Sequence, residues 1–385
     1  MHRNAPATVD TLLTELELVA FRNMNRLQLS IPRGITLITG ANGQGKTNIL
    51  EAVATIGLTK SPRSASLRES MKWDATYSRI RGVLDTGERG LDECIVEIDA
   101  REGMPRKRLL LNGESVAASA LIGRLPTVLF TPDHLSLVSG GPEERRRFLD
   151  IVLTQLPGDG RNDLLRYSRS LLQRNHLLRA MRDGTSDGME LPAFTEMCIA
   201  SAIAVMAHRQ RVISELAGAF TDHLSAFTPD AEVTALCYAP CGRESGQFPT
   251  REQFLSEMHA RLSRDVAAGS TSFGPHRDDL LLSIHSRPAR SVASQGQRRS
   301  IVLALLLSSV DLLRNHTETP PLLLLDDVLS ELDADRQERF LERLRAPATS
   351  QILITATDAA DDLLRLARPD HHLTVRNGEV SSTDD

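Results

Sequence analysis

Alternating apolar and polar positions predict strands at the beginning of the chain. Two short strands are expected within residues 15–31, separated by a turn at 22–25, and a third strand is expected at 35–39. A Gly-rich run at 40–45 follows, and the next apolar residues fall on one face of a helix: Ile49, Leu50, Val53 and Ile56. Strand-like sequence resumes over 76–130. The chain therefore begins with mixed α/β sequence.

The pattern changes at about residue 131. Apolar residues there recur at helical spacing and predict four helices, over 143–154, 164–182, 193–226 and 251–268. Pro and Gly residues between them exclude a long coiled coil. Strands and helices then alternate again, over 280–285, 294–315, 322–325, 334–345 and 352–356. We predict an α/β domain formed by residues 1–130 and 266–385, with a helical domain, 131–265, inserted between its halves.

Composition narrows the class of protein. The 385 residues are 41% hydrophobic and 25% charged, as in an ordinary globular protein, and the net charge is -5. No apolar run approaches the ~20 residues that span a bilayer, and the N-terminal sequence lacks the apolar core of a signal peptide, so we expect a cytoplasmic protein without a membrane partner. Mild acidity argues against a uniformly basic surface but allows a local basic patch. Only 4% of the residues are aromatic, which makes a long base-stacking platform unexpected.

One loop carries a specific chemical signature. Residues 40–47 fit the P-loop pattern G-x4-G-K-[ST] in full: Gly40, Ala41, Asn42, Gly43, Gln44, Gly45, Lys46 and Thr47. Glycines let the backbone curl so that its N–H groups face phosphates, and the following helix N-terminus adds partial positive charge. Lys46 would bridge the β- and γ-phosphates of ATP, and Thr47 would ligate Mg²⁺. Lysine is rare in this chain, with four among 45 basic residues, so its presence at this position is informative.

A second signature lies near the C-terminus. The apolar run 322–325 is typical of a central parallel strand, whose two faces are both covered, and it ends in two carboxylates, Asp326 and Asp327. Asp326, at the carboxyl end of the strand, would reach the Mg²⁺ ion. Asp327 would orient or deprotonate the attacking water and is the candidate catalytic acid–base residue, alongside Lys46.

Several weaker motifs have more than one interpretation. Ser294 and Gln297 form a capping box at a helix start, which with Gly296 between them is also a potential anion site. Residues 330–333 indicate another helix start, with Asp333 as N-cap. Residues 184–188 match the G-x-S-x-G pattern, but the preceding sequence is helical, so a loop is expected. The cluster at 273–279 is compatible with a metal site or with a turn that enters a hairpin.

The combination of these motifs resembles the head of ABC-type ATPases, in the branch shared with structural-maintenance-of-chromosomes (SMC) proteins. Within that branch it closely resembles the RecF family of bacterial recombination mediators. The segments that carry the resemblance are 18–29, 40–52, 130–150, 273–280, 294–299 and 322–336.

The resemblance implies an SMC-like ATPase head with a helical lobe, which forms a homodimer when ATP is bound. Ser294, Gly296 and Gln297 of one subunit would then contact the γ-phosphate held by the other, while Lys46, Thr47 and Asp326 act within a subunit. The family's N-terminal motif places Arg22 and Asn23 beside the nucleotide, with Asn48 next to the P-loop. The family also implies binding to duplex and gapped DNA, with RecO and RecR as partners that help load RecA onto SSB-coated single strands during repair and replication restart.

The chain departs from the ABC-transporter pattern at three points. The second acid is Asp327 instead of glutamate, residues 354–358 contain no switch histidine, and no convincing Q-loop glutamine precedes residue 130. A shorter carboxylate lies farther from the water, and even a 1 Å misplacement can cost ~100-fold in rate, so these differences indicate a slow ATPase. The alternatives are the ATPase subunit of a membrane transporter and a nuclease with an ATPase head, for which no separate acidic cluster is present.

The candidate DNA contacts are arginines. Two groups are available for phosphates, Arg145, Arg146 and Arg147, and Arg287, Arg290, Arg298 and Arg299. The alternative interpretation is that both groups lie on solvated helix faces.

Overall fold

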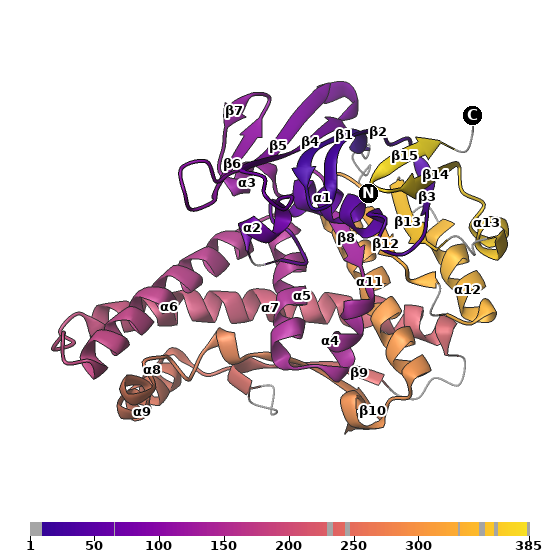
Figure 1. Cartoon of the computed structure of the whole chain (residues 1–385). Helices are drawn as coiled ribbons and strands as arrows, with labels where there is room; N and C mark the ends of the chain where they lie inside the picture. The colour runs from indigo at the N-terminus through magenta and orange to yellow at the C-terminus, as the bar shows by residue number, and fades with distance from the viewer. Residues whose placement is uncertain are drawn as a thin grey trace. The chain divides into compact units, whose positions relative to one another are not determined.

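The computed structural model describes residues 10–64, 66–228, 234–242, 247–329, 332–345, 351–357 and 361–382 (Figure 1). The chain divides into two compact units: unit 1 is Met1–His134 with Leu306–Asp385, and unit 2 is Leu135–Leu305. Helix α11 (Gln295–His316) begins in unit 2 and ends in unit 1. Residues 266–305 thus belong to unit 2, whereas the sequence analysis assigned them to the α/β domain. The reason is the pairing of β10 (Asp279–Ile284) with β9 (Thr234–Ala239), which holds this segment to the inserted part.

Unit 1 contains two six-stranded sheets. The antiparallel sheet has the order β2-β1-β4-β5-β6-β7, with strands β1 (Leu12–Phe21), β2 (Met24–Ser30), β4 (Tyr77–Asp85), β5 (Leu91–Asp99), β6 (Arg106–Leu111) and β7 (Glu114–Ser115). The second sheet has the order β15-β14-β3-β13-β12-β8, with strands β3 (Gly34–Thr39), β8 (Thr127–Phe130), β12 (Leu322–Asp326), β13 (Gln351–Ala356), β14 (His371–Arg376) and β15 (Glu379–Ser382). All of its neighbours pair in parallel except β14 and β15.

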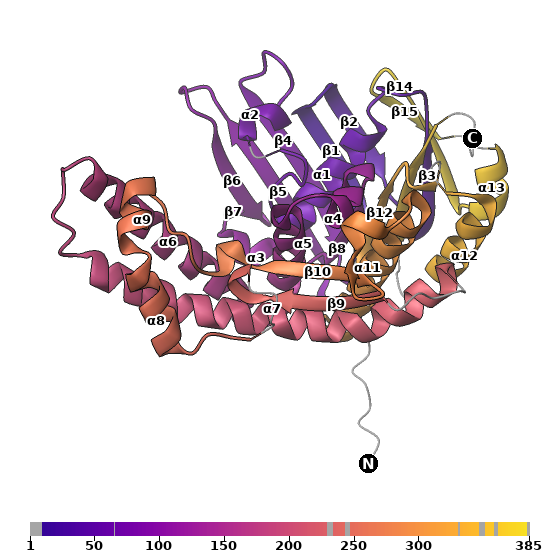
Figure 2. The ribbon, with the colours of Figure 1, turned by 90° about the horizontal axis from the view of Figure 1, so that it is seen from below.

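Helix α1 (Lys46–Leu58) packs between the two sheets, against β1, β4 and β5 on one side and β8, β12 and β13 on the other (Figure 2). Eleven of its thirteen residues are buried, which explains why its sequence is apolar on more than one face. Buried Gln351 joins β13 to the other sheet, because its side chain bonds both the N–H (2.9 Å) and the carbonyl (2.9 Å) of Leu13. Because α1 packs against both sheets and Gln351 joins them, the position of the helix relative to the preceding loop is fixed.

The smaller elements of unit 1 are α2 (Leu67–Ser70), η1 (Gly87–Arg89), α3 (Ala118–Leu121), α12 (Ala334–Arg345) and α13 (Asp361–Ala367). The turn η2 (Pro132–Leu135) lies at the unit boundary, because Leu135 is the first residue of unit 2. Helix α13 and strands β14 and β15 are not predicted from the sequence pattern. Strand β14 reads HHLTVR, which has little apolar content, and it forms in the sheet by pairing with β3. Tertiary pairing, not local pattern, therefore creates this part of the fold.

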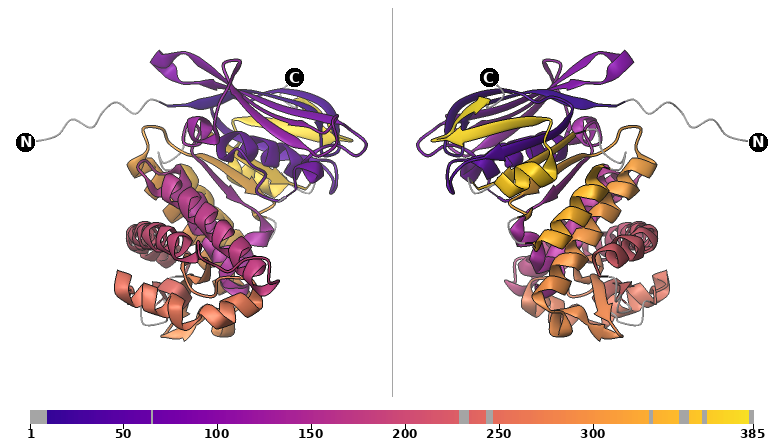
Figure 3. Two further views of the ribbon diagram at one scale, coloured as in Figure 1. Left: turned by 90° about the vertical axis from the view of Figure 1, so that its left-hand side faces the viewer. Right: turned by 90° about the vertical axis from the view of Figure 1, so that its right-hand side faces the viewer.

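Unit 2 is mostly helical, as expected. Its helices are α4 (Ser136–Ser139), α5 (Pro142–Gln155), α6 (Gly160–Arg182), α7 (Leu191–Phe227), α8 (Arg251–Ala260), α9 (Leu262–Ala268) and α10 (Ala289–Val292), with short turns η3 (Pro240–Gly242) and η4 (Pro275–Arg277). Helices α6 and α7 lie side by side (Figures 1 and 3). The loop at 184–188 connects these two helices, as expected.

Two details of unit 2 differ from the sequence-based expectation. A small sheet, β11-β10-β9, is present, in which β11 is Arg287–Pro288, so the insert is not purely helical. The helix predicted over 251–268 is two helices, because the chain leaves regular helix at Arg261, whose N–H bonds the carbonyls of both Glu257 and His259.

Among the described residues, α7 is the one helix long and apolar enough to cross a membrane by length and composition. Its apolar residues pack against α5, α6, α8 and β9 within unit 2. Helix α7 therefore serves as the central helix of this unit.

A buried ion pair fixes the 273–279 cluster as a turn that enters the β10 hairpin. Arg209 of α7 donates to Asp278 Oδ2 at 2.7 Å and to the Pro275 carbonyl at 2.7 Å, and Tyr238 also donates to Asp278. Burial lowers the pKa of His276 to about 4, and the neutral ring bonds Tyr167 and the Thr271 carbonyl. No His, Cys, Asp or Glu group suited to a metal ion is found in the described ranges. The cluster is thus a structural turn.

Candidate nucleotide-binding site

The P-loop lies at the carboxyl end of β3, between that strand and α1. Gly40, Gly43 and Gly45 all have positive φ angles, 149°, 80° and 113°. A Cβ on Gly40 would lie 2.3 Å from the Val375 carbonyl oxygen, and one on Gly45 would lie 2.8 Å from Met24 Cε. Only glycine can follow this path, which curls the backbone of residues 40–45 as a phosphate-binding loop requires.

Lys46 is the first residue of α1 and is buried, with 7% of its surface exposed. Its Nζ donates to the carbonyl oxygens of Gly40 at 2.5 Å and Ala41 at 3.0 Å, so the ammonium group lies over the loop itself. A compact ammonium at this point places one positive charge where phosphates would meet the helix N-terminus.

Thr47 and Asp326 meet although 279 residues separate them in the sequence. Thr47 Oγ1 donates to Asp326 Oδ1 at 2.8 Å, and Thr355 Oγ1 of β13 donates to the same oxygen at 2.8 Å. Burial raises the pKa of Asp326, and the two hydroxyl donors oppose this shift. Hydroxyl and carboxylate oxygens at one point fit Mg²⁺, which prefers oxygen ligands and completes its shell with phosphates and water.

Asp327 has an unusual backbone. Its φ is 50°, in the left-handed region, and its N–H donates to Thr355 Oγ1 at 3.0 Å. Aspartate tolerates this conformation better than most residues, and such backbone positions concentrate at functional sites. Thr355 thus positions both acidic residues, a role that the sequence analysis missed.

Asn23 and Asn48 flank the P-loop, as expected. Asn48 Nδ2 donates to Asn23 Oδ1 at 2.7 Å, and Asn23 Nδ2 donates to the Gln44 carbonyl at 3.4 Å. The Gln44 side chain in turn accepts from the N–H of Asn377, at 2.5 Å, in the β14–β15 turn. The turn between β1 and β2 is therefore tied directly to the loop.

Arg22 has a partner that the sequence analysis did not identify. Its guanidinium forms a two-pronged contact with Glu51 of α1, with Nε 3.0 Å from Oε2 and Nη2 2.6 Å from Oε1. The Glu51 side chain is fully buried and also accepts from Arg63 (3.2 Å) and Ser61 (2.6 Å). Arg22 thus fixes the turn that carries Asn23. The signal in the sequence was that Glu51 is a charged residue among the apolar residues of this helix, which indicates a buried partner of opposite charge.

The signature helix α11 begins with the expected capping box. Gln297 N–H donates to Ser294 Oγ at 3.2 Å, and Ser294 N–H donates to Gln297 Oε1 at 2.7 Å. Ser294, Gly296 and Gln297 belong to unit 2, whereas the P-loop belongs to unit 1. Asp333 caps α12 through Arg336 N–H at 3.0 Å, as expected, while Ser330 and Glu331 lie outside the described residues.

The candidate DNA-binding arginines differ in availability. Arg145 is buried and pairs with Asp279, with Nε 2.6 Å from Oδ1, so the prediction that it contacts DNA is wrong. Arg146 is half-buried and donates to the Asp278 carbonyl, and Arg298 donates to the Arg290 carbonyl. Arg299 is half-buried. Arg147, Arg287 and Arg290 are exposed. Three consecutive arginines, 145–147, look alike in the sequence, so the sequence did not show that Arg145 is the one that is buried.

Comparison with known proteins agrees with this geometry. The model of the RecF/RecN/SMC N-terminal domain matches residues 12–376. The DNA replication and repair protein RecF of Chloroflexus aurantiacus is 37% identical, covering 94% of this chain and 97% of that protein. RecF of Heliobacterium modesticaldum is 35% identical, covering 89% of this chain and 91% of that protein.

Solved structures give the same result. A structure of the recombination mediator protein RecF with ATP, of the RecFOR pathway, superposes with a TM-score of 0.87 at 27% identity, covering 99% of this chain and 100% of the other. An Smc head bound to a domain of ScpA shares the fold, with a TM-score of 0.55 at 16% identity over 96% of this chain and 97% of the other. The chain therefore has the fold of an ABC/SMC-type ATPase head and belongs to the RecF family of DNA replication and repair proteins.

Proposed function

We propose that this protein is an ATP-dependent DNA-binding recombination mediator whose ATP site is the P-loop at 40–47. The observation that carries the proposal is the 2.8 Å contact between Thr47 and Asp326, which joins the loop to the end of β12. Lys46 holds the β- and γ-phosphates. Thr47 and Asp326 would hold Mg²⁺, which would neutralise charge at the phosphates when bound. Asn23, Asn48 and Arg22 shape the loop's outer side.

ATP is the signal for homodimer formation in this proposal. Ser294, Gly296 and Gln297 present a capped helix N-terminus, which favours an anion, to the γ-phosphate held by the partner subunit. Asp327 accepts a proton from the attacking water. Hydrolysis is slow, because the shorter aspartate reaches less far than glutamate. Its role is to reset the dimer.

The dimer binds duplex or gapped DNA at the edges of single-strand gaps, through arginine–phosphate contacts that include the exposed Arg147, Arg287 and Arg290. Together with RecO and RecR it helps RecA replace SSB on the single strand, in the cytoplasm where the chromosome lies. Support comes from the relatives and from the RecFOR-pathway structure described above. A transporter subunit is disfavoured by the same comparisons and by the missing switch histidine.

DNA binding is expected to depend on both ATP and salt. At one fixed salt concentration the wild-type chain should bind gapped DNA more tightly with ATP than without it, and the affinity should fall as salt rises because phosphate contacts release counterions. Fluorescence anisotropy of labelled DNA measures both effects. Equal affinity with and without ATP would contradict an ATP-switched dimer.

A further inference from the structure

Two large apolar side chains are exposed at one end of the antiparallel sheet of unit 1. Trp73, before β4, is 87% exposed, and Met104, between β5 and β6, is 86% exposed. Their loops are neighbours, because the Ala100 N–H donates to the Thr76 carbonyl at 2.8 Å. Trp73 is the single tryptophan of the chain. Exposed tryptophan is common at binding surfaces, since the indole offers a large rigid face.

The turn that carries Trp73 is well fixed. The Lys72 N–H donates to the Ala20 carbonyl at 2.8 Å, and the Ala75 N–H closes the turn on the Lys72 carbonyl at 3.1 Å. Asp74 adopts a left-handed φ of 63°, and Met71 pairs with Phe21. The indole is therefore held in solvent by an ordered turn, so that little ordering would be needed on binding.

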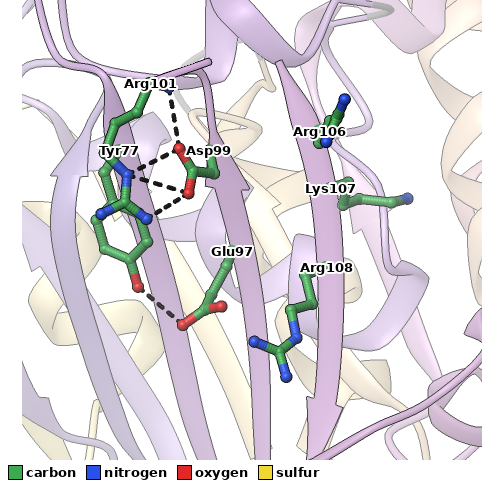
Figure 4. Close-up of a pocket in the computed structure, with 7 residues that line it drawn as sticks. All are labelled: Tyr77, Glu97, Asp99, Arg101, Arg106, Lys107 and Arg108. Atoms are coloured by element: carbon green, nitrogen blue, oxygen red, sulfur yellow. Dashed lines mark hydrogen bonds and ion pairs between the residues drawn. The ribbon is translucent and has the colours of Figure 1, made fainter. Parts of the chain in front are cut away.

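A basic pocket of ≈ 660 Å³ lies at the same end of the sheet (Figure 4). Its lining contains four cationic and two acidic residues besides Tyr77, which are Arg101, Arg106, Lys107, Arg108, Glu97 and Asp99. The excess of two positive charges contrasts with the net charge of -5 of the whole chain. The pocket is thus a local basic site on an acidic protein.

Part of this charge is used within the protein. Arg101 pairs with Asp99 and lies 5.5 Å from the Tyr77 ring centroid, and Tyr77 donates to Glu97 at 2.8 Å (Figure 4). Lys107 donates to the Thr59 carbonyl at the end of α1. These contacts fix the walls of the pocket. Of its four cationic residues, the two arginines of β6 therefore remain available to a ligand.

Arg106 and Arg108 are the cations available to a ligand. Both side chains are exposed, and the Arg108 side chain makes no hydrogen bond or ion pair with any residue in the described part of the chain. Arg106 has only a long, exposed contact of 3.5 Å to Glu102. The two side chains leave the same face of β6 about 7 Å apart along the strand, so each can contact a different phosphate of one DNA strand.

We infer that this end of the sheet binds DNA at the junction between single and double strand, with Trp73 stacked on an unpaired or terminal base and Arg106 and Arg108 on the adjacent phosphates. The inference rests on the proposed function and adds the element that distinguishes a gap from a continuous duplex. A continuous duplex exposes base faces only at its two ends, whereas a gap exposes one at each of its internal edges. One rigid aromatic is enough for this contact, so the low aromatic content is no obstacle.

The single tryptophan allows a direct test with the full chain and ATP. Trp73 emission should be quenched when gapped DNA binds and should change little when continuous duplex closed by a hairpin loop at each end binds. Binding itself is followed separately by anisotropy of labelled DNA. Poly-glutamate serves as a probe for an acidic protein partner at the same surface.

Substitutions separate stacking from charge. Trp73→Ala should weaken binding to gapped DNA about tenfold and leave duplex binding unchanged, because stacking on one base is worth that much. Arg108→Gln should weaken both. The matched controls are Met189→Ala, an exposed apolar residue of unit 2, and Arg89→Gln, an exposed arginine paired with Glu318, which should bind as wild type.

Three results would overturn the inference. They are unquenched Trp73 emission on saturating gapped DNA, a Trp73→Ala protein that binds like Met189→Ala, or quenching by poly-glutamate and not by DNA. If anisotropy shows that the wild-type chain binds neither DNA, the proposed function fails as well.

Discussion

Replacing Asp327 with asparagine is expected to slow ATP hydrolysis by about 100-fold or more while ATP binding is retained, because the amide cannot accept a proton from water. The backbone should not change, since asparagine also tolerates a left-handed φ and the N–H bond to Thr355 is unaffected. The ATP-bound dimer should therefore accumulate. Single-turnover experiments measure the hydrolysis rate, a nucleotide-binding assay measures ATP affinity, and the molecular mass in solution shows whether the dimer accumulates.

Asp333→Asn is the matched control, because Asp333 is exposed and asparagine caps a helix equally well. Its hydrolysis rate should equal that of wild type. An Asp327→Asn protein that is monomeric and free of ATP would contradict the role assigned to Asp327.

Replacing Glu51 with alanine is expected to lower the free energy of unfolding by about 3 kcal/mol, near the lower end for a broken buried ion pair. Glu51 has no exposed side-chain surface and accepts from Arg22, Arg63 and Ser61. The loss is moderated because Arg22 and Arg63 are 21% and 40% exposed and can reach water. Denaturant unfolding curves measure the change.

Glu17→Ala is the control for this prediction. Glu17 pairs with Arg26, whose side chain is 71% exposed, and such a surface pair contributes at most about 1 kcal/mol. Equal unfolding midpoints for the two variants would show that the Arg22–Glu51 contact does not hold the β1–β2 turn. ATP affinity should fall in Glu51→Ala alone, because that turn carries Asn23 beside the P-loop.

The sequence predicted the parts of this site that depend on local chemistry. Residues 40–47 and the apolar strand ending at Asp326 carry their signatures in a few consecutive residues, and the parallel order of β3, β13 and β12 brings them together. The capping box at Ser294 and the N-cap Asp333 are also local, and both were confirmed.

The parts that it did not predict depend on contacts between distant residues. In the sequence, Glu51 is one polar residue in an apolar helix. Its partner, Arg22, lies in the β1–β2 turn and is known only from the structure. Arg145 and Arg147 are indistinguishable in sequence, yet one pairs with Asp279, 134 residues away, and the other is exposed. The boundary near 265 was misplaced because β10 pairs with β9 of the inserted part, which lies far from it in the sequence.

The central claim is that ATP at the P-loop controls assembly of the protein on DNA. The most direct measurement is the mass of wild type and Lys46→Met on gapped DNA, with and without ATP, by analytical ultracentrifugation. Methionine retains most of the unbranched stem of Lys46 but lacks the charge that binds phosphate. Wild type should dimerise only with ATP, and Lys46→Met should stay monomeric in both conditions. A wild-type dimer without ATP, or a Lys46→Met dimer with ATP, would contradict the account.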